Sequence, residues 1–185
     1  MSNAIVEESD VIAGVYLVVP AGFGDARGRF AETYRRSWFP TGREMVQANL
    51  AERAEGTVVG LHYHLHQADY WYFTRGRARV VLHDLRGGSA TDGATLHLDM
   101  GDDDGRGLFI PPGVAHGFAA LTDLAIVYLV DQYYNPEDEL GVAWDDPAIA
   151  ADWKVSDPVL SARDLGNPRR DAIPAGRRPY AGLRT

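Results

Sequence analysis

The sequence contains no cysteine, so a disulfide framework, thiolate chemistry and Cys-ligated zinc or iron-sulfur sites are all excluded. It also has no apolar run long enough to cross a bilayer, and no basic segment precedes its first apolar residues. A cytoplasmic location with no membrane partner is therefore expected. The net charge of -8 disfavours nucleic acid as a partner, because phosphates must be neutralised by clustered Lys or Arg.

Helical periodicity is scarce, and short β-type segments recur along the chain. Gly- and Asp-rich turns such as RGGSATDG (86–93) and GDDDGRG (101–107) separate most of them. This pattern predicts an all-β sandwich or barrel. Helical signal is limited to short stretches at 32–39 and 146–153. The segments expected as strands are 14–20, 44–50, 57–65, 70–76, 77–85, 94–100, 107–113 and 124–134.

A length of 185 residues suits one domain with one core. After Asp164 the composition shifts to Pro, Gly and Arg in the segment LGNPRRDAIPAGRRPYAGLRT. We therefore expect a single β-barrel domain over 1–164. Residues 165–185 are expected to form an irregular tail that wraps on the surface or on a partner subunit.

The stretch GLHYHLHQADYW (60–71) places three histidines at alternate positions, followed by an acid, Asp69. In a strand, His62, His64 and His66 would share one face, with neighbours about 7 Å apart. If that face points into the barrel, the imidazoles can bind a metal or act as a base near neutral pH. If it points outward, they are polar surface.

A second stretch, GRGLFIPPGVAHGFAAL (105–121), ends a β-segment with proline and glycine and then presents His116. Together the two stretches resemble the two-motif signature of the cupin superfamily, with Asp69 in place of Glu and Ala120 in place of Asn. Cupins are small double-stranded β-helix jelly rolls, so the resemblance implies this fold with a few short peripheral helices. In metal cupins these motifs bind a divalent transition metal such as iron, manganese, nickel, copper or zinc. The ligands implied here are His62, His64, Asp69 and His116.

Ordered segments over residues 11–168 carry a second and more specific resemblance. The sequence resembles the dTDP-4-dehydrorhamnose 3,5-epimerase family, whose members are cupin-fold enzymes, generally metal-free homodimers. The resemblance implies an isomerase that acts on a dTDP-4-keto-6-deoxyhexose at C3, C5 or both in deoxysugar biosynthesis, without a cofactor and as a homodimer. The matching segments are DARGRFAE (25–32), VQANL (46–50), GLHYH (60–64), HDLRGGSATDG (83–93), IPPGVAHGF (110–118), YLVDQYYNPEDELGVAWDDP (128–147) and LSARD (160–164).

The same resemblance implies roles for particular residues. His62 is the base that takes a proton from the sugar carbon next to the C4 ketone, and Asp164 orients its imidazole. Tyr128 reprotonates the enolate from the opposite side of the ring. Outside such a site, these polar side chains would be ordinary ion pairs, strand polars and core aromatics. The positions that match residues holding the nucleotide diphosphate, the sugar or the catalytic groups are Arg27, Glu32, Gln47, Asn49, His116 and Tyr134.

Two departures from the family pattern affect the implied chemistry. Val59 stands where the family typically has an arginine, and Asp69 stands where it has the lysine near the ketone oxygen. A carboxylate there repels the negative charge that the enolate carries. Two alternatives therefore stay open. One is a metal-dependent cupin isomerase or oxygenase, in which a Lewis acid replaces the lysine, and the other is a non-catalytic sugar- or nucleotide-binding cupin. His62 cannot be both a free base and a tight metal ligand, so the epimerase mechanism and the four-ligand metal mechanism exclude each other.

Overall fold

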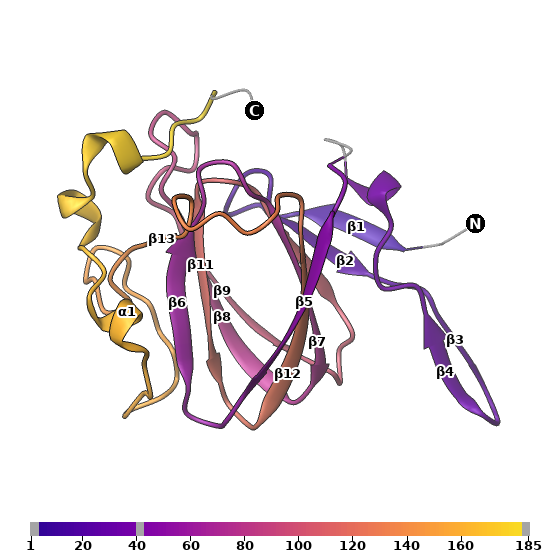
Figure 1. Cartoon of the computed structure of the whole chain (residues 1–185). Coiled ribbons are helices and arrows are strands. Elements are labelled where there is room, and N and C mark those ends of the chain that lie inside the picture. Colours follow the sequence, from indigo (N-terminus) through magenta and orange to yellow (C-terminus); the bar gives the residue numbers. More distant parts are fainter. Residues whose placement is uncertain (1–3, 40–42, 183–185) are drawn as a thin grey trace.

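The computed structural model describes residues 4–39 and 43–182 and shows two antiparallel sheets facing each other (Figure 1). The first sheet has the order β1-β2-β10-β7-β12-β5, and the second has the order β13-β6-β11-β8-β9. The first comprises β1 (Ile5–Glu8), β2 (Tyr16–Val19), β10 (Gly107–Ile110), β7 (Asp69–Arg75), β12 (Leu124–Val130) and β5 (Gln47–Arg53). The second comprises β13 (Leu140–Gly141), β6 (Val58–Tyr63), β11 (Val114–Ala120), β8 (Arg77–Asp84) and β9 (Thr95–Gly101).

The main core lies between the two sheets, because alternate residues of each strand face the opposite layer. Val80 and Leu82 of β8 point inward and share one apolar cluster with Trp71 and Phe73 of β7. Burying each large apolar side chain in this way contributes about 1.5–3 kcal/mol. The interior therefore holds the two sheets together and fixes the strands that carry the site.

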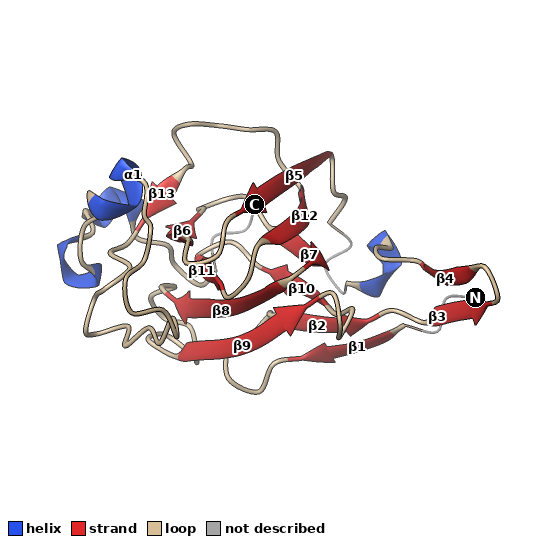
Figure 2. Cartoon of the chain, turned by 90° about the horizontal axis from the view of Figure 1, so that it is seen from below, coloured by secondary structure: helices blue, strands red, loops and turns tan. Residues whose placement is uncertain are grey.

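A second apolar cluster covers the outer face of the β13-β6-β11-β8-β9 sheet. Val81 of β8 and Tyr63 of β6 point outward and pack with Trp153 and Ile173 from the C-terminal part of the chain. Figure 2 shows the helical segments of the C-terminal part of the chain, coloured blue, on the outside of β6 and β13. They are α1 (Ala162–Leu165) and the 3-10 turns η2 (Arg170–Ala172) and η3 (Ala175–Arg177).

The all-β prediction is confirmed, and each segment expected as a strand overlaps one. Five strands were not predicted: β1, β11, β13 and the two strands of a separate hairpin described below. Strand β11 has the sequence VAHGFAA and lies between β6 and β8, where it is buried. It was not predicted because its small residues have low β propensity.

The helical expectations are only partly met. Stretch 32–39 contains the 3-10 turn η1 (Arg36–Trp38), but the described residues 146–153 form turns and no helix. The Asp146 carboxylate accepts the backbone N–H groups of Ala148 and Arg170, and Ala150 has a φ of 54°, in the left-handed region. Both features oppose helix propagation through this stretch.

One hairpin stands apart from the sandwich. The strands β3 (Gly22–Asp25) and β4 (Gly28–Ala31) pair only with each other and project from the body of the molecule (Figure 1). Phe23 and Phe30, which are paired across the hairpin, are 61% and 70% exposed. The sequence did not predict this hairpin, because it is short and rich in glycine.

The predicted boundary between a domain at 1–164 and a tail at 165–185 stays a prediction, and residues 1–3 and 183–185 of these ranges lie outside the described residues. Within the described tail, Ile173 is buried and Tyr180 forms a bridge with Gly87. In the part of the chain that the structure describes, no helix has the length and apolarity that a membrane span requires.

Candidate active site

A cavity of about 250 Å³ opens between the two sheets. Strands β5, β7 and β12 of one sheet and β6 and β11 of the other supply most of its wall. The apolar part of the wall includes Trp71, Phe118 and Ile126. The polar side chains that line it are Arg53, His62, His64, Gln67, Asp69, His116, Tyr128, Glu139 and Arg163.

Two glycines allow the strands that carry His62 and His116 to lie close together. His62 of β6 and His116 of β11 are direct partners in register. A Cβ on Gly60 would lie 2.8 Å from the Cα of Gly117, and Gly60 has a φ of 112°. Only glycine fits this approach without displacing backbone.

His62 forms a hydrogen-bonded pair with Asp164. The Nε2 of His62 lies 2.6 Å from the Oδ1 of Asp164, and the His62 side chain is 19% exposed on the cavity wall. Ser161 caps helix α1 and donates its hydroxyl to the Oδ2 of Asp164 at 2.8 Å. Burial opposes the carboxylate charge, but the contacts with His62, Ser161 and Arg163 together hold the pKa of Asp164 below its usual range. Because an ionised carboxylate only accepts, Nε2 of His62 donates to it, and Nδ1 keeps the lone pair that a base needs.

Tyr128 lies across the cavity from this pair. It belongs to β12, in the sheet opposite β6, and its side chain lines the same cavity. Burial, together with the charges of Asp69 and Glu139, raises the pKa of Tyr128. The phenol is therefore protonated at neutral pH and is suited to donate a proton. An imidazole with a ring-nitrogen lone pair and a protonated phenol thus lie on opposite walls of one cavity.

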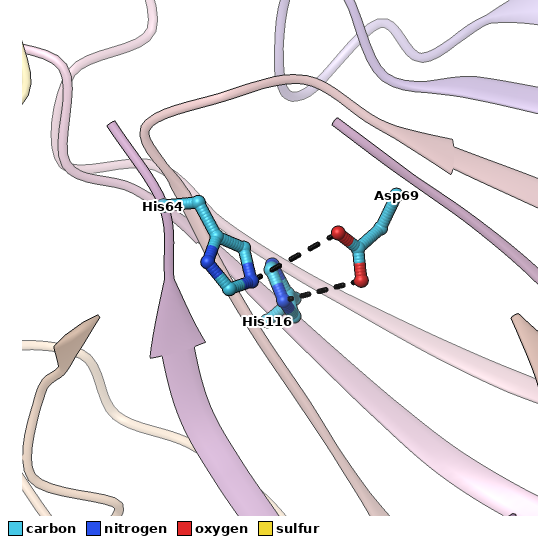
Figure 3. A group of neighbouring side chains, drawn as sticks. All are labelled: His64, Asp69 and His116. Atoms are coloured by element: carbon cyan, nitrogen blue, oxygen red, sulfur yellow. Dashed lines mark ion pairs between the residues drawn. The ribbon is translucent and has the colours of Figure 1, made fainter. Parts of the chain in front are cut away.

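A second polar cluster, formed by His64, Asp69 and His116, lies beside the first (Figure 3). The Nε2 of His64 is 3.9 Å from the Oδ1 of Asp69, and the Nε2 of His116 is 3.8 Å from its Oδ2. The Nδ1 of His64 bonds the backbone oxygen of Asp138 at 2.8 Å, and the Nδ1 of His116 bonds that of Val114 at 2.9 Å. Burial lowers the pKa of His116, against the opposing charge of Asp69.

Two neutral donors hold the Asp69 carboxylate in place. Gln67 donates its Nε2 to Oδ1 at 2.9 Å, and Trp71 donates its Nε1 to Oδ2 at 3.1 Å. All three residues are buried or nearly so, at 4% exposure for Asp69. The carboxylate therefore has a fixed direction, toward the two imidazoles (Figure 3).

Of the four metal ligands that the cupin resemblance implies, the structure groups three and separates the fourth, His62. Potential ligand atoms of His64, Asp69 and His116 all lie within 4.8 Å of one another. His62 does not belong to this cluster, because its Nε2 is bound to Asp164. The base and the trio are two neighbouring groups rather than one four-ligand site.

The prediction that three histidines share one strand face is wrong for His66. Strand β6 ends at Tyr63, and His66 is exposed in the loop that follows. The Asp138 carboxylate accepts the backbone N–H groups of Leu65 and His66 at 2.6 and 3.1 Å, which turns the chain away from an extended path.

The remaining predicted site residues divide into two groups. Gln47 and Asn49 lie on the same face of β5 as Ala51 and Arg53, which line the cavity. The Nε2 of Gln47 donates to the Oδ1 of Asn49 at 2.9 Å, and its Oε1 accepts the backbone N–H of Tyr134 at 3.3 Å. These three residues therefore form a connected group beside the cavity.

Arg27 and Glu32 lie elsewhere. Arg27 is at the turn of the β3–β4 hairpin and pairs with Asp25, and Glu32 follows that hairpin and pairs with Arg35. Neither residue lines the cavity between the sheets of its own chain. The structure thus does not bring these two predicted residues to the site.

Sequence reasoning missed several residues of the cavity. Arg53, Glu139 and Arg163 line it, and Arg163 pairs with Glu139 at 3.1 Å. Ser161 was also missed, although Ser161-x-x-Asp164 is the spacing of a helix cap and could have been found. The arginines and Glu139 had no comparable local signal, because only the fold brings them together.

The fold is a cupin-type jelly roll, and its cavity carries side chains suited to acid–base chemistry. The model of the dTDP-4-dehydrorhamnose 3,5-epimerase family matches residues 9–171. The chain belongs to this family and is an epimerase, an enzyme of the isomerase class. The predicted fold and family are thereby confirmed.

Known proteins agree with this assignment. A dTDP-4-dehydrorhamnose 3,5-epimerase from Sinorhizobium fredii is 39% identical over 172 residues, covering 88% of each chain. A dTDP-4-dehydrorhamnose 3-epimerase from Streptomyces niveus is 36% identical over 180 residues, covering 93% of this chain and 84% of the relative. The crystal structure of an epimerase from Legionella pneumophila in complex with dTDP-4-keto-L-rhamnose superposes with a TM-score of 0.91 at 28% identity, covering 97% of this chain and 99% of that one. These relatives favour the epimerase over both alternatives that the sequence left open.

Proposed function

We propose that this chain inverts C3, or C3 and C5, of a dTDP-4-keto-6-deoxyhexose in deoxysugar biosynthesis. The observation that carries the proposal is the His62–Asp164 pair facing Tyr128 across one cavity. Epimerisation requires a base on one face of a carbon and an acid on the other. Relatives named for dTDP-4-dehydrorhamnose, with specificities for C3 and C5 or for C3 alone, supply the substrate class.

Each step can be assigned to a residue of this chain. The C4 ketone makes the hydrogens on the adjacent carbons acidic, and the Nδ1 of His62 takes one of these protons. The electron pair of the broken C–H bond passes to the C4 oxygen as an enolate. Asp164 stabilises the imidazolium that forms. The Tyr128 phenol then donates its proton to the opposite face of the same carbon, which restores the ketone and inverts the centre. These proton transfers need no cofactor.

The groups beside the base would hold the rest of the substrate. We assign Gln47, Asn49 and Tyr134 to binding, because they form one hydrogen-bonded group next to the cavity. His116 lines the cavity itself. Arg53, on the same strand face as Asn49, adds positive charge on this side.

We further propose that the active protein is a homodimer in which the β3–β4 hairpin contacts the partner. The hairpin projects from its own body and exposes Phe23 and Phe30 (Figure 1). It also carries Arg27, which lies away from the cavity of its own chain. Packing on a partner would bury the two phenylalanines and bring Arg27 and Glu32 to a neighbouring subunit.

Sedimentation velocity tests this assembly. We expect wild-type protein at micromolar concentration to sediment as a dimer. Changing both Phe23 and Phe30 to serine should shift it toward the monomer, because two exposed aromatics lose their contact. Val159→Ser, at another exposed apolar position, is the matched control and should leave the dimer intact. A wild-type protein that sediments as a monomer would overturn the proposal.

The reaction itself is tested by proton NMR of dTDP-4-keto-6-deoxyglucose with the purified protein in heavy water. Deuterium entering C3 alone identifies a 3-epimerase, and deuterium entering C3 and C5 identifies a 3,5-epimerase. Absence of exchange at both carbons would contradict the proposed reaction on this substrate.

A further inference from the structure

Three hydrogen-bond acceptors face one another in the cluster of His64, Asp69 and His116. Each imidazole donates its Nδ1 hydrogen to a backbone oxygen, so in the neutral ring Nε2 carries a lone pair. Both Nε2 atoms point at the Asp69 carboxylate from 3.8–3.9 Å, which is beyond hydrogen-bond length (Figure 3). Such an arrangement of buried acceptors is unfavourable unless positive charge lies between them.

We propose that His64, Asp69 and His116 bind a divalent transition metal ion, next to His62 and without it. Two imidazole nitrogens and one carboxylate are a ligand set that zinc, cobalt, iron and nickel accept. Ligands about 2.0–2.1 Å from a tetrahedral ion lie about 3.4 Å from one another. The two imidazoles lie 3.8 and 3.9 Å from the carboxylate and all ligand atoms lie within 4.8 Å of one another, so binding an ion requires the side chains to move inward.

The surroundings of the trio match what metal ligands need. Backbone oxygens of Asp138 and Val114 fix the tautomer and direction of both rings. Gln67 and Trp71 fix the carboxylate of Asp69 with neutral hydrogen bonds, so its negative charge is not cancelled by them. The trio also lines the cavity, so an ion held there would have one side open to a ligand.

The position gives the ion a role that depends on the proposed epimerase reaction. The enolate needs positive charge near its oxygen, and Asp69 supplies the opposite sign. The single lysine of the sequence, Lys154, is bound to Asp99. Two arginines line the cavity: Arg163 is paired with Glu139, and Arg53 donates to the backbone oxygen of Glu52. A divalent ion held by the trio would offset the charge of Asp69 and would supply a Lewis acid for the C4 carbonyl, while His62 keeps its lone pair as base.

Metal binding is tested on the full chain without reference to activity. The protein is treated with a chelator, desalted and titrated with Co²⁺, whose visible absorption reports nitrogen and oxygen ligation, and Zn²⁺ content is measured by elemental analysis. We expect one ion per chain. Asp69→Asn and His64→Gln should each weaken binding at least tenfold, as loss of a ligand does. If one variant fails to fold, as judged by circular dichroism, the other carries the test.

Two matched variants locate the ion. His62→Asn and His66→Asn should bind Co²⁺ as the wild type does, because neither residue belongs to the trio. Loss of binding in His62→Asn would overturn the three-ligand site in favour of one that includes the base. Loss in His66→Asn would place the ion at the exposed loop and would also overturn the proposal, as would a wild-type protein that binds no ion.

The exchange experiment separates this inference from the proposed function. Chelator-treated protein is expected to exchange C3 hydrogen at least tenfold more slowly, and added Zn²⁺ or Co²⁺ should restore the rate. Exchange by a protein that binds no ion would overturn the metal site and leave the epimerase standing. Binding of one ion with no exchange at any loading would support the metal site and overturn the reaction.

Discussion

Replacing His62 with asparagine is expected to lower the rate of hydrogen exchange at C3 by about a hundredfold to ten-thousandfold, because that is what a positioned general base contributes. Asparagine matches the inner half of the imidazole, so it leaves the position of Nε2, which Asp164 binds, empty, and it has no basic nitrogen. The loss should appear in the rate constant for exchange rather than in substrate affinity. Deuterium incorporation from heavy water, followed by proton NMR, measures it directly.

Two companion variants make this result specific to the base. His66→Asn removes an exposed histidine that lies outside the cavity, and it should exchange at the wild-type rate. Asp164→Asn keeps the size of the side chain but removes the charge that stabilises the imidazolium, so a loss of about a hundredfold is expected. If His62→Asn retained near-wild-type exchange while remaining folded, His62 would not be the base.

The sheets were predictable from the sequence because their strands carry a local signal. In β7 and β8, alternating or continuous apolar residues end at glycine and Asp-rich turns, and the structure follows them. The strand β11 lacked this signal, because its burial depends on the neighbours β6 and β8 rather than on its own composition. The projecting hairpin was not predicted either, because β3 and β4 bury little surface and therefore carry no alternating apolar pattern.

The proposed catalytic pair could be predicted only through resemblance to the family. His62 and Asp164 are 102 residues apart, and spacing along a chain does not predict such a contact. Ser161 could have been predicted as a partner of Asp164, because the spacing of the two residues is typical of a helix N-cap. The sequence could not predict that His64 faces the cavity and His66 faces solvent. This difference depends on Asp138, whose backbone oxygen bonds the His64 ring and whose carboxylate bonds the backbone N–H of His66.

The separation of His62 from the cluster of His64, Asp69 and His116 explains how an epimerase can accommodate the carboxylate of Asp69. Asp69, grouped with His64 and His116, places a carboxylate in the cavity, and a carboxylate beside the reacting ketone opposes enolate formation. The same three residues become useful to the reaction once they hold a cation. The structure thus lets one cavity contain both a free base, because Asp164 engages His62, and a separate set of ligand atoms.

Replacing Tyr128 with phenylalanine should separate proton removal from inversion. His62 would still abstract the C3 proton and could return a deuteron to the same face, so exchange should persist within about tenfold of the wild type. Formation of the inverted product should fall by at least about a hundredfold, because the acid on the opposite wall is lost. Phenylalanine keeps the packing of the ring in β12, so the change acts on the hydroxyl alone.

The two quantities are read from one NMR time course, as deuterium at C3 and as the ratio of the two epimers. Tyr133→Phe, which removes a hydroxyl from an exposed ring outside the cavity, is the control and should change neither. Equal losses of exchange and inversion in Tyr128→Phe would mean that Tyr128 supports enolate formation instead of delivering the proton. Loss of inversion alone would assign the two faces of the sugar to the two sheets, with His62 acting from β6 and Tyr128 from β12.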